Sequence, residues 1–249
     1  MIYDIITYNG ESDLFDLRYN ILKDYVDEFR VVEFDKTFSG KPRKRAFLQM
    51  YEKVKCYYIT EDVWSKYREL AESSPNTKGA IHWKTEFAQK ESIKDCLTDL
   101  KDDDICFIGD CDEVYEELMG YSEPRKLRLR VYTYWLNNRS SEEFFGPLMA
   151  RYGEIKSECL NHLRTNVERD ECEHGWHFTS LKDKLKQKLT DSYTEESYAT
   201  KEVLDNLEDN IENNRDFLGR EFTYKIDESE WPQYLKDNRE KYKHLLKKE

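Results

Sequence analysis

Short apolar segments recur through the first half of the chain, and segments with helical periodicity lie between them. The β-rich segments cover residues 2–8, 29–34, 54–60 and 104–109. Apolar side chains recur at helical spacing between the first and second of these segments, and again between residues 83 and 100, whereas residues 61–82 are polar and irregular. Strands that alternate with helices are typical of a mostly parallel sheet whose faces are covered by helices. The sequence therefore predicts an α/β fold.

The second half of the chain has a different pattern. Residues 127–137 alternate strictly from one side chain to the next, which predicts an antiparallel or edge strand with one face toward solvent or a ligand. Beyond residue 182 the chain is rich in lysine, glutamate and asparagine, and its pattern is helical to the end. We therefore expect one α/β domain over residues 1–182 and a helical C-terminal extension over residues 183–249 that packs on the same domain.

The charge balance limits the partners of the protein. The 249 residues carry a formal net charge of −12, which argues against a broad electrostatic grip on nucleic acid, because that grip depends on neutralising phosphates. The basic segments 41–45 and 124–130 leave a local anion site open. No apolar stretch approaches the roughly 20 residues that span a bilayer. The N-terminus lacks the basic and apolar regions of a signal peptide. We expect a cytoplasmic protein without a signal peptide or a transmembrane anchor.

The apolar segment 105–109 ends abruptly at three acids, Asp110, Asp112 and Glu113. In an open α/β sheet, ligands bind just outside the carboxyl ends of the strands. Side chains two residues apart in extended backbone point the same way, so Asp110 and Asp112 can both reach one divalent ion. Hard oxygen ligands suit Mg²⁺ or Mn²⁺, which usually bridge protein carboxylates to substrate phosphates. The alternative is a loop that is acidic without a function.

Two chemistries use such a junction. In glycosyltransferases of the GT-A type, the acidic pair holds a metal ion on the diphosphate of a nucleotide sugar. In phosphatases of the haloacid dehalogenase class, the first aspartate of a DxDx[TV] motif is a nucleophile, and the segment DCDEV fits that pattern. The phosphatase motif normally opens its fold, whereas here more than 100 residues precede it. Its position therefore favours the glycosyltransferase.

The flanking segments resemble glycosyltransferase family 17, which includes the β-1,4-mannosyl-glycoprotein N-acetylglucosaminyltransferase and many bacterial and viral relatives. Residues 13–43, DLFDLRYNILKDYVDEFRVVEFDKTFSGKPR, are similar to the opening of that family, where a leucine-rich helix precedes D-x-F-V-V-x-E-S and T-F-x-G-K-P. Three further blocks match in order: Glu86 to Lys90 for E-x-x-Q-R, ICFIGDCDEV for an apolar strand with D-x-D-E-I, and GWHF at 175–178. The chain departs from the family pattern at Glu33-Phe34-Asp35, at Lys90 in place of arginine, and at Thr179-Ser180-Leu181.

The resemblance identifies the chain as a bacterial or viral member of the family and implies a GT-A-like, Rossmann-like fold. It also implies a UDP-sugar donor, a divalent cation (Mn²⁺ or Mg²⁺) and inversion at the anomeric carbon. The donated sugar would be GlcNAc or a related hexose, and the acceptor a hydroxyl of a glycan or another molecule. A modified base of phage DNA is a less favoured acceptor because the net charge is negative. The alternatives are the phosphatase and a non-catalytic relative that binds carbohydrate or nucleotide.

The resemblance also implies roles for single residues around the metal site. Asp110 and Asp112 hold the metal ion, and Asp110 thereby contributes to donor binding. His177 of GWHF is a further metal ligand if its turn presents the imidazole there, and is otherwise a half-buried loop histidine. Trp176 is expected to stack beside the sugar or the acceptor.

An inverting displacement needs a general base that takes the proton of the acceptor hydroxyl. The two candidates are Glu113, beside the metal pair, and Glu173, ahead of GWHF. Arg18 and Glu86 lie in matched blocks but on predicted helices, where we expect structural ion pairs.

Two further pairs of residues are expected near the donor. Glu33 and Asp35 follow the strand 29–34 at the same edge of the sheet, where carboxylates read the ribose or uridine hydroxyls of a nucleotide. A cap on the next turn is the alternative for them. Lys41 and Arg43 either approach the diphosphate or belong to a solvated loop.

Overall fold

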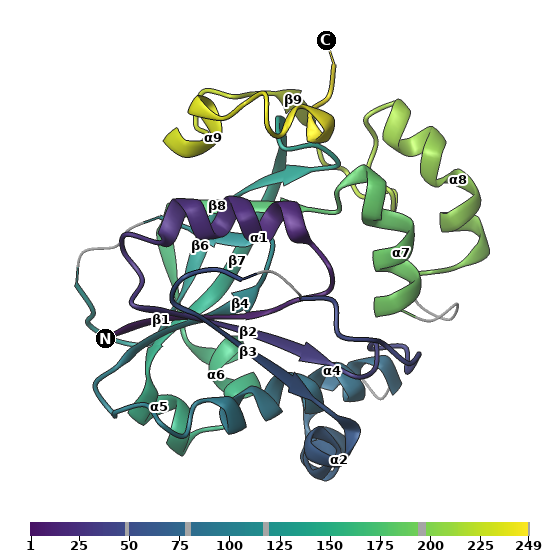
Figure 1. Cartoon of the computed structure of the whole chain (residues 1–249). Helices are drawn as coiled ribbons and strands as arrows, with labels where there is room; N and C mark the ends of the chain where they lie inside the picture. Colours follow the sequence, from purple (N-terminus) through teal and green to yellow (C-terminus); the bar gives the residue numbers. More distant parts are fainter. Residues whose placement is uncertain (48–49, 78–80, 117–119, 194–197, 249) are drawn as a thin grey trace.

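The computed structural model describes residues 1–47, 50–77, 81–116, 120–193 and 198–248. Within these residues, one nine-stranded sheet forms the centre of the molecule, in the order β3-β2-β1-β4-β7-β6-β8-β5, with β9 paired to β7 (Figure 1). The strands are β1 (Ile2–Thr7), β2 (Glu28–Phe34), β3 (Val54–Ile59), β4 (Ile105–Asp110), β5 (Glu113–Tyr115), β6 (Arg125–Thr133), β7 (Asn138–Arg151), β8 (Glu168–Thr179) and β9 (Tyr224–Ile226).

The four strands of the first half pair in parallel. Strand β1 lies between β2 and β4, so that Ile5 is opposite Arg30 on one side and Ile108 on the other. Strand β3 continues the parallel part beyond β2. All four carboxyl ends therefore meet at one edge of the sheet. The predicted α/β sheet flanked by helices is confirmed.

The second half of the sheet mixes orientations. Strand β7 runs antiparallel to both β4 and β6, whereas β6 and β8 run parallel. The antiparallel strand expected at 127–137 is β6, but it lies between β7 and β8, so the alternative of an edge position is wrong. Its alternation arises because Leu127 and Leu129 are buried on one face while Arg128 and Arg130 form ion pairs on the other.

Helices cover both faces of the sheet (Figure 1). Helix α1 packs on one face, and α4, α5 and α6 pack on the other. Successive side chains of a strand point to opposite faces; accordingly Ile5 of β1 joins the layer of α4 to α6, and Ile6 joins the layer of α1. No helix in the described ranges has the length and apolar character needed to cross a membrane. The helices up to β8 are α1 (Ser12–Leu22), α2 (Glu61–Trp64), α3 (Arg68–Ser73), α4 (Ile81–Ser92), α5 (Tyr152–Ser157) and α6 (Leu160–Asn166).

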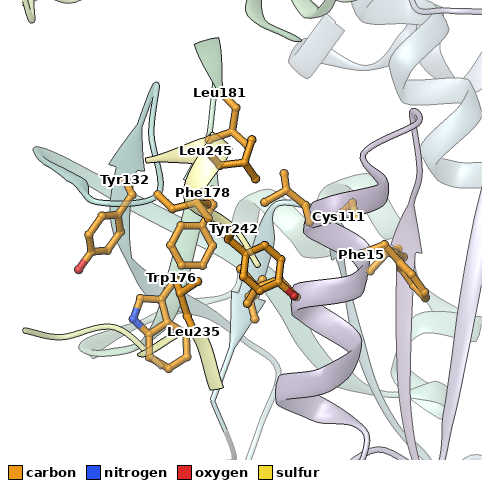
Figure 2. Close-up of a cluster of buried hydrophobic side chains, with 14 of the residues drawn as sticks. Phe15, Cys111, Tyr132, Trp176, Phe178, Leu181, Leu235, Tyr242 and Leu245 are labelled. Carbon is orange, nitrogen blue, oxygen red and sulfur yellow. The ribbon is translucent and has the colours of Figure 1, made fainter. Parts of the chain in front are cut away.

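The C-terminal part is mainly helical and contains α7 (Lys182–Ser192), α8 (Lys201–Glu212) and α9 (Gln233–Asp237), besides the short strand β9. Helices α7 and α8 pack together through leucine and isoleucine side chains around Tyr134. The end of the chain returns to α1 and the sheet, where Tyr242 packs in one cluster with Phe15 and Trp176 (Figure 2). The division into parts at residue 182 stays a prediction.

Candidate active site

A pocket of about 230 Å³ opens at the carboxyl ends of β1, β2 and β4. Its walls are the loop after β1 with the start of α1, the segment after β2, one face of α4, and helix α7. Ligands of open α/β sheets bind at this edge. Charged side chains in the described lining include Glu11, Arg43, Glu86, Asp110, Asp112 and Lys188.

The acidic junction, residues 110–113 at the end of β4, presents Asp110 and Asp112 to this pocket. Asp110 ends β4, and Asp112 follows two positions later; both line the pocket. Cys111 between them is buried in the apolar cluster that contains Phe15 and Phe178 (Figure 2). Cys111 and Asp112 form a turn directly after β4, and this turn places the sulfur in the core while both carboxylates line the pocket.

Asp110 is held by a hydroxyl and an ammonium group. The Thr7 hydroxyl donates to its Oδ1 at 2.5 Å, and Lys90 Nζ lies 3.5 Å from its Oδ2. Burial opposes ionisation of Asp110, but the positive charges of Lys90 and Arg164 outweigh it and lower the pKa of this carboxyl. Lys90 also forms an ion pair at 2.7 Å with Glu86, which confirms the ion pair expected of Glu86.

Asp112 is almost enclosed, with 10% of its side chain exposed. Its Oδ2 accepts a hydrogen bond of 2.7 Å from Lys188 Nζ and lies 3.6 Å from His177 Nε2. Lys188 also donates to the Thr179 hydroxyl at 3.2 Å. Burial opposes ionisation, but Lys188 and His177 outweigh it and hold the pKa of Asp112 well below its ordinary value. Asp112 is therefore a carboxylate at neutral pH.

The side chain of Glu113, the first residue of β5, lies outside the described pocket lining and folds back toward the end of β4. Its Oε2 accepts the backbone N–H of Asp110 at 3.1 Å. The carboxylate packs against Gly109 and Gly146, where an added Cβ would lie 2.3 Å and 3.1 Å from it. Burial raises the pKa of Glu113, and the negative charge of Asp110 raises it further. The carboxylate of Glu113 leaves no room for a side chain at Gly109 and little at Gly146.

Arg18 fixes the backbone of the acidic junction from below. Its guanidinium makes two bonds to the Asp4 carboxylate, at 2.6 and 2.7 Å, with both side chains fully buried. It also donates to the carbonyl oxygens of Asp110, at 3.3 Å, and of Glu113. The structural ion pair predicted for Arg18 is confirmed. Through it α1 positions the two metal-binding candidates.

The donor set of Asp110 and Asp112 suits a hard divalent cation. No three His, Cys, Asp or Glu side chains within the described ranges are arranged to hold a metal ion by themselves. A Mg²⁺-like ion is usually held by one or two carboxylates, with substrate phosphates and waters completing its shell. Two pocket-lining carboxylates fit that mode of binding, whereas a closed site made by the protein alone does not form here.

Glu11 is a third carboxylate at this site, which the sequence analysis did not predict. It follows β1 and lines the pocket, and its Oε2 accepts the backbone N–H of Asn9 at 2.6 Å. Burial raises the pKa of Glu11 to about 7, and the charge of Asp112 contributes in the same direction. The position after β1 is the signal that could have found it, because strand ends at this edge share the site.

Replacing Glu11 with glutamine is expected to stabilise the ligand-free protein, by about 1 kcal/mol at pH 8. The carboxyl has a pKa of about 7 in the folded chain and about 4.5 in the unfolded chain. The folded state therefore loses stability as the pH rises from 4.5 to 7, and the neutral amide removes that loss. Thermal unfolding at pH 8 and at pH 4.5 measures it: the gain is expected at pH 8 and absent at pH 4.5. The exposed Glu240→Gln is the control, and an equal gain at both pH values contradicts the interpretation.

The two acids expected to read the nucleotide make structural contacts. Glu33 is buried and accepts the backbone N–H groups of Ala46, at 2.7 Å, and Phe47, at 3.2 Å. Asp35 accepts the backbone N–H of Glu61 at 2.9 Å and the indole N–H of Trp64 at 3.0 Å. Asp35 thus caps α2, which follows β3, and not the next turn of the chain that was the alternative for it. Neither acid is among the described residues that line the pocket.

Of the two expected cations, one lines the pocket and the other does not. Arg43 lines the pocket and donates to the side chain of Asn9. Lys41 lies outside the described lining and donates to the Thr190 carbonyl at 2.7 Å, with Asp191 at 3.6 Å. Of this pair, Arg43 alone is placed to meet a ligand in the pocket, whereas Lys41 joins the segment after β2 to α7.

The residues expected around GWHF divide between site and core. The ring of His177 stacks on Phe144 with centroids 3.8 Å apart and approaches Asp112 as described above. Trp176 is buried under the C-terminal segment, and its indole N–H donates to the Glu230 carbonyl at 2.6 Å (Figure 2). Glu173 pairs with Arg139 at 2.8 Å. Neither Trp176 nor Glu173 is among the described lining residues, so no role at the sugar is proposed for them.

The family model described as glycosyltransferase family 17 matches residues 1–249. No curated protein matches the chain. Among solved structures, 2-C-methyl-D-erythritol 4-phosphate cytidylyltransferase of Francisella tularensis is similar at 14% identity and a TM-score of 0.38, covering 75% of this chain and 97% of that one. Mouse xyloside xylosyltransferase 1, in its apo form, is similar at 8% identity and a TM-score of 0.33, covering 64% and 69%.

The match to the family model extends over every block quoted from the sequence, from the helix after β1 to GWHF and on to the end of the chain. This match favours a glycosyltransferase over a phosphatase and over a non-catalytic relative. The chain belongs to glycosyltransferase family 17, and the protein is a glycosyltransferase.

Proposed function

We propose that this enzyme transfers GlcNAc or a related hexose from a UDP-sugar to a hydroxyl group, with inversion at the anomeric carbon and dependence on a divalent cation. The observation that carries the proposal is the pair Asp110 and Asp112, both ionised and both lining the pocket at the carboxyl end of β4. Carboxylates at such a strand end serve cation-assisted binding of phosphates.

Asp110 and Asp112 would hold Mn²⁺ or Mg²⁺. A bound divalent ion supplies positive charge to the donor diphosphate, which makes UDP a better leaving group. The role of His177 as a further metal ligand stays a prediction: its Nε2 lies 3.6 Å from Asp112 Oδ2, although the residue is not in the described pocket lining. Arg43 and the face of α4 that lines the pocket are placed to receive the remainder of the donor.

In the proposed step, an acceptor oxygen attacks the anomeric carbon while the bond from that carbon to the β-phosphate oxygen breaks. The proton of the acceptor hydroxyl passes to a base, and UDP leaves with the electron pair. Glu113 is not assigned as this base, because its buried carboxylate lies outside the described pocket lining and accepts the Asp110 N–H. We propose a glycan or another small hydroxyl acceptor rather than nucleic acid, because the net charge is −12.

Thermal unfolding in the presence of UDP-sugars, with and without Mn²⁺, tests the donor. A ligand present at about 100 times its dissociation constant stabilises the folded state by about 2.7 kcal/mol. We expect a rise in the unfolding temperature that requires both UDP-sugar and Mn²⁺, and slow UDP release in the same mixture. A rise with sugar phosphates alone, independent of uridine, contradicts the proposed donor.

A further inference from the structure

Lys188 occupies the place of a cation at the acidic pair. Its Nζ lies 2.7 Å from Asp112 Oδ2, and the hydroxyl of Thr179 accepts its second hydrogen bond at 3.2 Å. The lysine comes from α7, which the chain adds after β8, far in sequence from β4. The Asp112 carboxylate therefore has a positive partner before any ligand enters the pocket.

A divalent ion and Lys188 cannot share this carboxylate at low cost. A Mg²⁺-like ion held by a carboxylate oxygen lies about 2.0–2.1 Å from it. The ammonium group, hydrogen-bonded to the same carboxylate, would then be only a few ångströms from the ion in a mostly enclosed site. Like charges at such separations repel by several kcal/mol near a protein surface. Binding of the ion alone must therefore compete with Lys188.

The pocket offers Lys188 another partner once a donor is bound. Lys188 and its α7 neighbours line the same cavity as Asp110 and Asp112. Its flexible four-carbon stem lets the ammonium group move without a shift of the helix. Helix α7 is itself anchored, since Leu185 and Leu189 pack against α8 and Tyr134. A diphosphate in the cavity would lie within reach of the side chain.

We propose that the ammonium group of Lys188 has two alternative partners in the donor site. Without a donor it neutralises Asp112, and when metal ion and donor bind together it passes from Asp112 to the donor diphosphate. This inference rests on the proposed function, because it requires a diphosphate donor and a cation at Asp112. Metal ion and UDP then bind cooperatively, because the ion releases Lys188 from Asp112 and the diphosphate holds Lys188 away from the ion, and the coupling is reciprocal.

Mn²⁺ binding followed by electron paramagnetic resonance, which detects the free ion, tests the proposal without turnover. Lys188→Met is expected to bind Mn²⁺ alone about tenfold more tightly than the wild type, because the competing charge is gone. At saturating Mn²⁺ it is expected to bind UDP about tenfold more weakly, because the diphosphate loses a cation. An affinity for Mn²⁺ alone that is unchanged or lower overturns the proposal, as does an unchanged affinity for UDP.

Matched variants separate this result from its alternatives. Lys186→Met removes the same charge from an exposed position of α7 outside the described pocket lining, and both affinities are expected to stay at wild-type values. Lys188→Gln keeps a hydrogen-bond donor for Asp112 and serves if the methionine variant does not fold, as judged by circular dichroism. It is expected to change both affinities in the same directions. If the wild type binds no Mn²⁺ even with UDP, the proposed function itself fails; if it binds both and Lys188→Met matches it, the role of Lys188 alone fails.

Discussion

Asp112→Asn is expected to lower the rate of sugar transfer about 10³-fold, which corresponds to about 4 kcal/mol of transition-state stabilisation. The amide keeps the shape of the side chain but loses the negative charge that binds a cation. Asp112 is the more enclosed member of the pair, with 10% of its side chain exposed against 37% for Asp110, so water has little room to replace it. Initial rates of UDP release at saturating Mn²⁺ and donor measure the effect.

A suitable control for this variant is Asp205→Asn, which removes an equal charge from an exposed ion pair on α8. It is expected to retain wild-type activity. The unfolding temperature of Asp112→Asn is expected to respond to UDP-sugar equally with and without Mn²⁺, since the metal-dependent part is lost. Transfer within tenfold of the wild type, in a variant that is folded by circular dichroism, would refute the assignment of Asp112 to the metal ion.

Local patterns in the sequence were sufficient for the parallel half of the sheet. The segments expected at 29–34 and 54–60 are the strands Glu28–Phe34 and Val54–Ile59. The first is a buried and mostly apolar run, as is typical of a central parallel strand, whereas the second lies at the edge of the sheet and is only partly buried. The helix expected between 83 and 100 ends earlier, since α4 stops at Ser92 and a 3₁₀ turn covers Ile93–Cys96. The segment 61–82, expected to be irregular, contains α2 and α3.

Local sequence patterns predicted only part of the candidate site. The position of Asp110 at the carboxyl end of a strand was predictable, whereas Asp112 reaches the same pocket from the turn that follows the strand. The partner of Asp112 was not predictable, because Lys188 is one of many lysines in a polar segment and its place depends on how α7 packs. Trp176, in contrast, was expected at the site but lies in the core. An aromatic residue beside a motif was expected to meet the sugar, yet the C-terminal segment covers it with apolar side chains that no local pattern could assign to it (Figure 2).

Arg18→Met is expected to lower the free energy of unfolding by about 3–5 kcal/mol, because it leaves the buried Asp4 carboxylate without its partner. Both side chains are fully buried, and the loss is a large share of the 5–15 kcal/mol that stabilises a typical domain. Urea unfolding of wild type and variant measures the difference. The variant is also expected to lose activity where it remains folded, because Arg18 donates to the carbonyl oxygens of Asp110 and Glu113.

Two further variants show whether the buried pair causes this loss. Arg128→Met removes an arginine of β6 whose ion pair with Glu143 is partly exposed, and it is expected to cost less than about 1 kcal/mol. The double variant Asp4→Leu with Arg18→Met removes both buried charges, so it is expected to recover part of the stability that Arg18→Met loses, but not the activity. This separation arises because the stability depends on balancing the Asp4 charge, whereas the acidic junction depends on the guanidinium N–H groups themselves. A double variant less stable than Arg18→Met would contradict that division.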